Sequence, residues 1–130
     1  MKTAMNALTI VGIVAIFSIG CFANTSAQGA DKFQKLNGAQ IRTQFTGMEL
    51  SDGTHWADMF GGNGILTSNS MGKKRVGKWS VQNNELCLDL EKEISSCFEV
   101  WLQGKNAQLR HKGSDMSFLE GVLRKPSGRN

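Results

Sequence analysis

The chain has 130 residues, which is enough for one domain and short for two. Its 40% hydrophobic and 20% charged residues are ordinary for a globular protein, whereas its 15 glycines favour many tight turns. The formal charge of +4 falls to +3 without residues 1 to 27, whose one charged residue is Lys2, and so small an excess argues against nucleic acid, which is bound by clustered basic stripes.

The first 27 residues have the pattern of a secretory signal peptide. Lys2 supplies a positive start, residues 7 to 22 are mainly apolar, and small residues precede Gln28. We predict cleavage after Ala27 and a periplasmic or secreted mature protein. A membrane anchor is disfavoured, because the uninterrupted apolar stretch is shorter than the roughly 20 residues of a spanning helix. Lipoprotein processing at Cys21, which would tether the protein to a membrane, is the alternative.

Export determines the expected state of the cysteines. If Cys21 leaves with the signal peptide, Cys87 and Cys97 remain, and an oxidising compartment lets such a pair form a disulfide. A zinc site would need further His or Cys ligands near these two thiols. The sequence therefore predicts a disulfide, and it predicts no metal site and no cofactor.

One short helix is expected near the start of the mature chain. Residues 28 to 35 are polar and predict a short ordered or frayed leader. Asn37 and Gln40 then have the spacing of a helix capping box, and Gly47 can end a helix in the left-handed conformation. These signals predict a helix over about residues 37 to 46.

All segments after Gly47 predict strands separated by turn residues. Their spacing of about 8 to 12 residues is typical of an antiparallel sandwich or barrel. Parallel architecture is disfavoured, because each crossover would need about a dozen residues or more. The expected strands cover residues 48 to 50, 54 to 60, 65 to 70, 75 to 82, 85 to 90, 97 to 103, 106 to 111 and 117 to 124.

The hairpin that contains both cysteines has the clearest pattern, because its residues alternate between apolar and polar along both strands. Placing Cys87 opposite Cys97 puts Leu86 opposite Phe98, so the apolar sets face the same side. A slip of one residue would turn them to opposite sides. A two-residue turn at positions 104 and 105 extends this face into the next strand. It predicts two further pairs, Val100 with Leu109 and Leu102 with Ala107.

A meander of about eight strands with one buried face avoids exposed edges by closing on itself. The predicted fold is mainly β: a small antiparallel up-and-down, lipocalin-like barrel with one short N-terminal helix, spanning residues 36 to 125 before a tail at 126 to 130.

No catalytic motif stands out. His55 and His111 have no metal-binding or triad spacing, and nothing positions a nucleophile. Several carboxylates, Asp58 among them, would permit glycoside hydrolysis, which needs an acid and a base facing each other across a cleft. A solvated hairpin tip explains Glu91 and Glu93 more simply. An enzyme is therefore the least favoured class.

Two binding hypotheses remain, both for an expected monomer. The first is a non-enzymatic binding protein that holds a small, mostly apolar ligand in the interior or open end of the barrel, although eight strands leave little interior space. Its expected lining residues are Trp56, Phe60, Trp79 and His111. The second is an interaction with a protein, such as inhibition of an exported hydrolase, through a loop at residues 68 to 74. Its expected contact residues are Ser70, Lys73, Lys74 and Arg75.

Several short motifs occur together along the chain. They are Leu36-Asn37-Gly38, Gly77-Lys78-Trp79-Ser80-Val81, Glu85-Leu86-Cys87-Leu88, and Cys97-Phe98 in a strand that ends at Gly104. In these motifs the chain resembles a family of small exported bacterial proteins of unknown function, over most of residues 36 to 110. The resemblance implies an exported domain and no particular activity. The expected fold is also similar to lipocalin-like barrels and to periplasmic lysozyme inhibitors, which is a likeness of fold alone.

Overall fold

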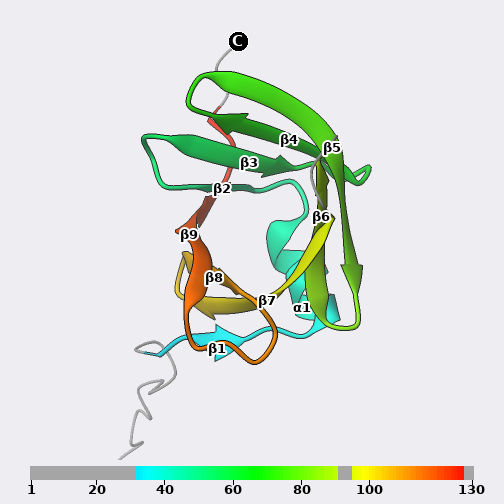
Figure 1. The fold of residues 1–130 in the computed structure, drawn as a ribbon, viewed down its shortest axis with the longest axis vertical. Coiled ribbons are helices and arrows are strands. Elements are labelled where there is room, and N and C mark those ends of the chain that lie inside the picture. The colour runs from blue at the N-terminus through cyan, green and yellow to red at the C-terminus, as the bar shows by residue number, and fades with distance from the viewer. Residues whose placement is uncertain (1–31, 91–94, 128–130) are drawn as a thin grey trace, which may run out of the picture.

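The computed structural model describes residues 32 to 90 and 95 to 127. Within them, eight antiparallel strands follow one another around a closed barrel, and the last strand returns to pair with the first (Figure 1). One short helix packs against this barrel. The predicted fold class is therefore confirmed. The predicted signal peptide, with its alternatives at Cys21 and Ala27, lies outside the described residues.

All eight predicted strands are present, each within two residues of its expected bounds. The barrel consists of β2 (Glu49–Ser51), β3 (Trp56–Phe60), β4 (Ile65–Ser70), β5 (Lys73–Gln82), β6 (Glu85–Leu90), β7 (Ser96–Gln103), β8 (Asn106–Arg110) and β9 (Ser117–Arg124). The helix α1 is Gly38–Phe45, and a further short strand, β1 (Gln34–Lys35), lies in the segment that was predicted as a leader.

The predicted capping box at the start of α1 is confirmed. The Asn37 side chain accepts a hydrogen bond from the Gln40 backbone N–H, and the Gln40 side chain accepts one from the Asn37 backbone N–H, both at 2.9 Å. At the other end, Gly47 has the left-handed φ of 76°, and its N–H donates to the carbonyl of Phe60 at 2.7 Å. The helix is therefore tied directly to the end of β3.

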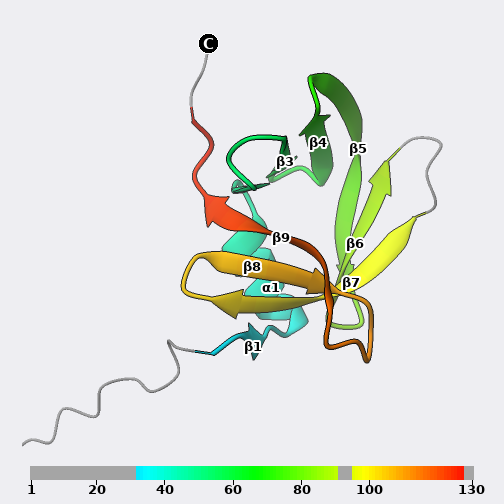
Figure 2. The same ribbon diagram turned by 60° about the vertical axis from the view of Figure 1, so that its left-hand side comes forward.

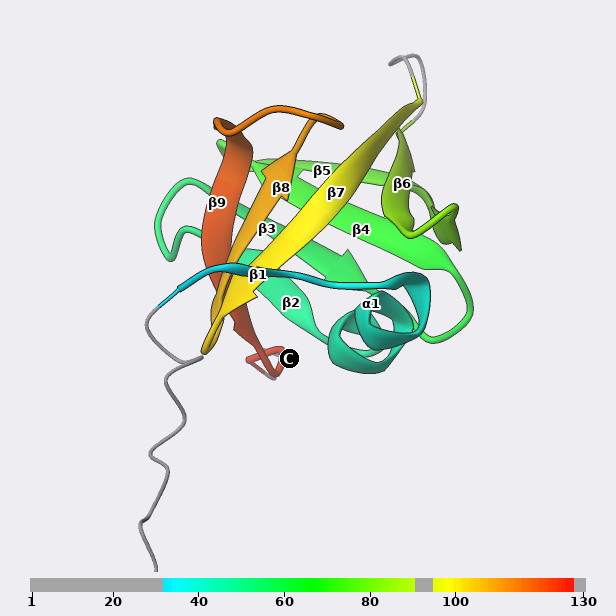
Figure 3. The same ribbon diagram turned by 90° about the horizontal axis from the view of Figure 1, so that it is seen from below.

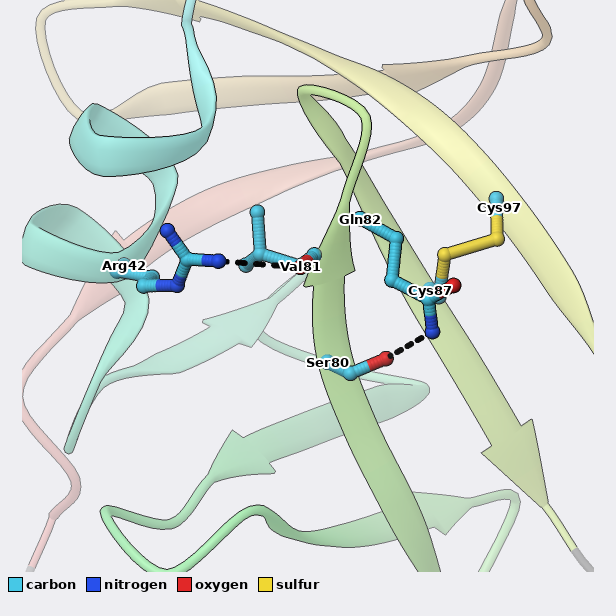
Figure 4. Close-up of a disulfide and its surroundings, with 6 residues drawn as sticks. All are labelled: Arg42, Ser80, Val81, Gln82, Cys87 and Cys97. Carbon is cyan, nitrogen blue, oxygen red and sulfur yellow. Dashed lines mark hydrogen bonds between the residues drawn. A yellow bond between two sulfur atoms is a disulfide. The ribbon is translucent and has the colours of Figure 1, made fainter.

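A disulfide joins β6 to β7 in the predicted register. Cys87 lies opposite Cys97, and Leu86 lies opposite Phe98. Figure 4 shows the disulfide beside β5, where the side chains of Ser80 and Gln82 hydrogen-bond to each other. The register of β7 with β8 is also as predicted, with the pairs Val100–Leu109 and Leu102–Ala107.

The strand β1 pairs with one edge of β7, beyond the residues of β7 that pair with β6. The described part of β6 pairs only with the first residues of β7, and β1 takes the same edge further along (Figure 2). Leu36 adds a backbone hydrogen bond to Val100 at 2.9 Å. Lys35 donates to the Glu99 carboxylate at 2.6 Å, and this hydrogen bond holds the pKa of Glu99 below its ordinary value.

The end of the barrel beside α1 is filled by aromatic side chains. Phe60 contacts Phe45 edge to face at a centroid distance of 5.1 Å, and it contacts Trp79 in the same way at 5.6 Å. The Trp79 indole N–H donates to the Gly61 carbonyl at 2.9 Å. We call this the closed end. The fully buried aliphatic residues of the barrel core include Ile41, Leu50, Leu66, Leu86, Val100 and Leu109.

Replacing both Cys87 and Cys97 by alanine should lower the free energy of unfolding. In the chain-entropy model, opening a loop with a sequence separation of 10 residues costs about 2 to 3 kcal/mol. Urea denaturation of the oxidised wild type and the double variant measures this difference. A loss below about 0.5 kcal/mol, within the range of an ordinary surface substitution, would contradict the expectation.

Candidate functional site at the open end of the barrel

Because neighbouring strands are antiparallel, successive connections between them lie at alternating ends of the barrel. The β3–β4 and β5–β6 connections lie at the closed end, where the Gly38 N–H of α1 donates to Asn84 at 2.8 Å. The β2–β3, β4–β5 and β8–β9 connections therefore lie at the other end, which we call the open end. Figure 3 shows the β8–β9 connection on the side of the barrel away from α1.

A cavity of about 180 Å³ lies at this open end. Most of its wall is apolar and comes from β6, β7 and β9. Asp58 reaches it from β3, which is four strands away from β7 around the barrel. The lining residues are Asp58, Leu88, Leu90, Ser96, Phe98, Phe118 and Leu119. Within the described residues, the cavity is therefore apolar on one side and has one carboxyl group, that of Asp58, on the other.

Asp58 is held in place by its neighbours across the strands. It lies opposite Ser68 of β4, and Ser68 in turn lies opposite Arg75 of β5. Only 7% of Asp58 is exposed, and this burial raises the pKa of its carboxyl group. The hydrogen bond with Ser68 and the charge of Arg75 oppose the rise. The pKa of this carboxyl group therefore lies above that of an ordinary aspartate.

An aromatic cluster forms the lip of the cavity. Phe118 is 62% exposed and stacks on the buried Phe98 with ring centroids 5.0 Å apart. The His111 ring lies 5.1 Å from each of these rings. An exposed phenylalanine held by stacking at the rim presents an apolar surface to anything that enters.

The four predicted lining residues are distributed over the molecule. His111 lies beside the open-end cavity, in the aromatic cluster just described. Phe60 and Trp79 lie at the closed end, where Phe60 has no exposed surface. Trp56 lines a separate cavity of about 240 Å³ together with His55 and Arg124. The structure therefore places His111 beside the candidate site, whereas Phe60 and Trp79 pack together next to it, with Trp79 directly opposite the lining residue Leu88.

The cavity beside Trp56 is formed by a rigid turn. The Asp52 carboxylate accepts the backbone N–H groups of residues 54 to 56 and lies 2.9 Å from the His55 ring. Desolvation acts to raise the Asp52 pKa, but these hydrogen bonds outweigh it and hold the pKa well below its usual range. The contacts of His55 are those of a turn that fixes the β2–β3 connection.

The expected partner loop at residues 68 to 74 is the tight end of the β4–β5 hairpin. Ser70 ends β4 and Lys73 begins β5, which leaves a two-residue turn. Strand pairing continues to the turn because Met71 and Gly72 both adopt left-handed conformations, with φ of 50° and 79°. Met71 at the tip is 75% exposed.

Sequence reasoning missed Asp58 as the polar group of this site and weighed it only for glycoside hydrolysis. A usable signal was present, because Trp56, Asp58 and Phe60 alternate along one strand and so share a face. A charged residue on an otherwise apolar face is a marker of function or of a buried polar contact.

No family model, no curated protein and no solved structure matches this chain. The resemblance to small exported bacterial proteins therefore stays a prediction. Across residues 32 to 90 and 95 to 127, no helix is long and apolar enough to span a membrane. The same ranges contain no group of three or more His, Cys, Asp or Glu residues arranged to hold a metal ion.

The stability of the protein should fall with rising pH relative to an Asp58→Asn variant. Because the folded-state pKa of Asp58 is raised, the folded protein keeps a proton that the unfolded chain has already released. The contribution is therefore largest below the ordinary aspartate pKa and is lost as pH rises through the folded-state value. Urea denaturation of both proteins between about pH 3.5 and pH 7 measures it. A difference that is constant, or that moves the other way, would exclude a raised pKa.

Proposed function

We propose that this protein is an exported, non-enzymatic binding protein that takes up a small, mostly apolar ligand at the open end of its barrel. The observation that carries the proposal is the cavity of about 180 Å³ between the apolar wall of β6, β7 and β9 and Asp58 on β3. A concave apolar site with few polar groups is the usual form of a small-molecule site.

The asymmetry of the barrel favours this function. At the closed end the ring of Phe60 packs edge to face against both Phe45 and Trp79, and Phe45 and Phe60 have no exposed surface. The open-end cavity is close in size to an engineered apolar cavity of about 150 Å³ that binds benzene. A ligand with one substituted ring, or the end of a short apolar chain, therefore matches its volume.

The proposed location rests on the disulfide and on the predicted signal peptide. Disulfides such as Cys87–Cys97 persist in oxidising compartments and are rare in the cytosol. Cys97 is exposed, so it would meet the reductants of a reducing compartment directly. We accordingly place the protein in the periplasm or outside the cell, as a monomer.

Protein isolated from its own cell envelope should carry a bound small molecule that native mass spectrometry detects as an added mass. A Leu90→Trp variant should lose this mass, because the larger ring would fill the cavity that Leu90 lines. Val76→Trp is the matched control, since Val76 is exposed on the outer surface of β5. A clean apo mass for the wild type, or an added mass that survives Leu90→Trp, would count against the proposal.

The hairpin of β4 and β5 favours a second candidate function, binding of an acidic protein partner such as an exported hydrolase. Its tip combines the exposed Met71 with Lys73 and Lys74 on the strand that follows. An apolar tip flanked by cations is a suitable contact for an acidic groove.

Charge reversal at Lys73 and Lys74 should abolish capture of such a partner from an envelope extract. Arg75 is left unchanged, because its charge acts on Asp58. Lys105→Glu with Lys125→Glu makes the same change of net charge at exposed positions away from the hairpin tip. Equal capture of every partner by both double variants would remove the hairpin hypothesis.

A further inference from the structure

Among the residues that the structure describes, one ionisable side chain lines the open-end cavity. Of its seven lining residues, five are Leu or Phe, one is Ser96, and one is Asp58. The positive charge of Arg75 acts on Asp58. Arg75 is exposed, however, and it is not among the residues that line the cavity. Among these lining residues, the ionisable group that a ligand would contact is therefore the carboxyl group of Asp58.

A buried carboxylate is costly unless cations or hydrogen-bond donors compensate it. The Ser68 hydroxyl provides one hydrogen bond and Arg75 a nearby positive charge, whereas an ionised carboxylate has about four acceptor positions. A ligand with an ammonium group would supply both further donors and the opposite charge. Such charge-assisted hydrogen bonds are stronger than those between neutral groups.

Ligands of other charge gain less from this arrangement. A carboxylic acid would place a like charge beside Asp58, which is unfavourable in a cavity of low dielectric constant. A neutral alcohol could donate one hydrogen bond to Asp58 and would gain no charge interaction.

We propose that the cavity selects a primary amine on an aromatic ring or a short apolar chain, with its ammonium group on Asp58 and its apolar part against Leu88 and Phe98. The two parts of such a ligand match the two sides of the cavity, since Asp58 projects from β3 and the apolar wall lies across the barrel. This assignment rests on the proposed ligand-binding function and names its substrate class.

Three probes of similar shape test the assignment: phenethylamine, phenethyl alcohol and phenylacetate. Each is titrated at physiological ionic strength into the oxidised protein while backbone amide chemical shifts are followed by NMR. Phenethylamine should bind about tenfold or more tightly than phenethyl alcohol, because its hydrogen bonds to Asp58 are charge-assisted. Phenylacetate should bind most weakly. The largest shifts should fall on residues of β6, β7 and β9 at the open end.

Asp58→Asn keeps the shape of the side chain and removes its charge. In this variant the preference for the amine over the alcohol should fall to about threefold or less, the difference expected between neutral hydrogen bonds. Asp89→Asn is the matched control, since Asp89 is an exposed aspartate on β6, between the lining residues Leu88 and Leu90. It should keep the full preference.

The possible results separate the two proposals. Equal binding of amine and alcohol by the wild type, or tighter binding of phenylacetate, would overturn amine selection and leave the binding function standing. An amine preference that survives Asp58→Asn would overturn the role of Asp58. If none of the three probes shifts any open-end residue, both proposals fail. The comparison of probes on the wild type alone decides the sign of selection even if Asp58→Asn does not fold.

Discussion

The register between β6 and β7 is the constraint on which the rest of the structure depends. It is fixed twice, by the covalent bond between Cys87 and Cys97 and by the apolar pairing of Leu86 with Phe98 on the opposite face. Both demand the same alignment, so hydrophobic burial and the disulfide reinforce each other. A shift of one residue would put Leu88 and Phe98 on opposite faces of the sheet and break the apolar wall of the cavity.

Two glycines let the barrel close tightly around this register. A Cβ atom at Gly77 would lie 2.0 Å from the Asp89 carbonyl oxygen, and one at Gly121 would lie 2.8 Å from that of Ser51. Both positions are pinned between neighbouring backbones, where only glycine fits without movement.

The local parts of this fold were predictable from the sequence. Alternation placed all eight barrel strands, and the spacing of Asn37 and Gln40 placed the helix start, because each signal acts within a few residues. The strand β1 was missed because its two residues carry no pattern of their own. They pair with β7 only because the described part of β6 leaves that edge, which is a property of the tertiary fold.

The site was harder to predict for a related reason. Alternation tells which face of a strand a residue occupies, but it does not tell how far along the barrel axis the residue lies. Phe60 and Trp79 were therefore expected to line a ligand site, although they fill the closed end. Leu88 and Phe98, expected only as core, form the cavity wall. Asp58 belongs to the same inward face of β3 as Phe60. It lines the cavity because it lies nearer to the open end of the barrel than Phe60 does.

The central claim is that the barrel has a ligand-sized apolar space at its open end and a filled interior at its closed end. Crystals of the oxidised protein pressurised with xenon test this without assuming any ligand chemistry, since xenon occupies apolar cavities of this size. We expect one anomalous peak between Leu88, Phe98 and Leu119. A peak among Phe45, Phe60 and Trp79, or none at the open end, would contradict it.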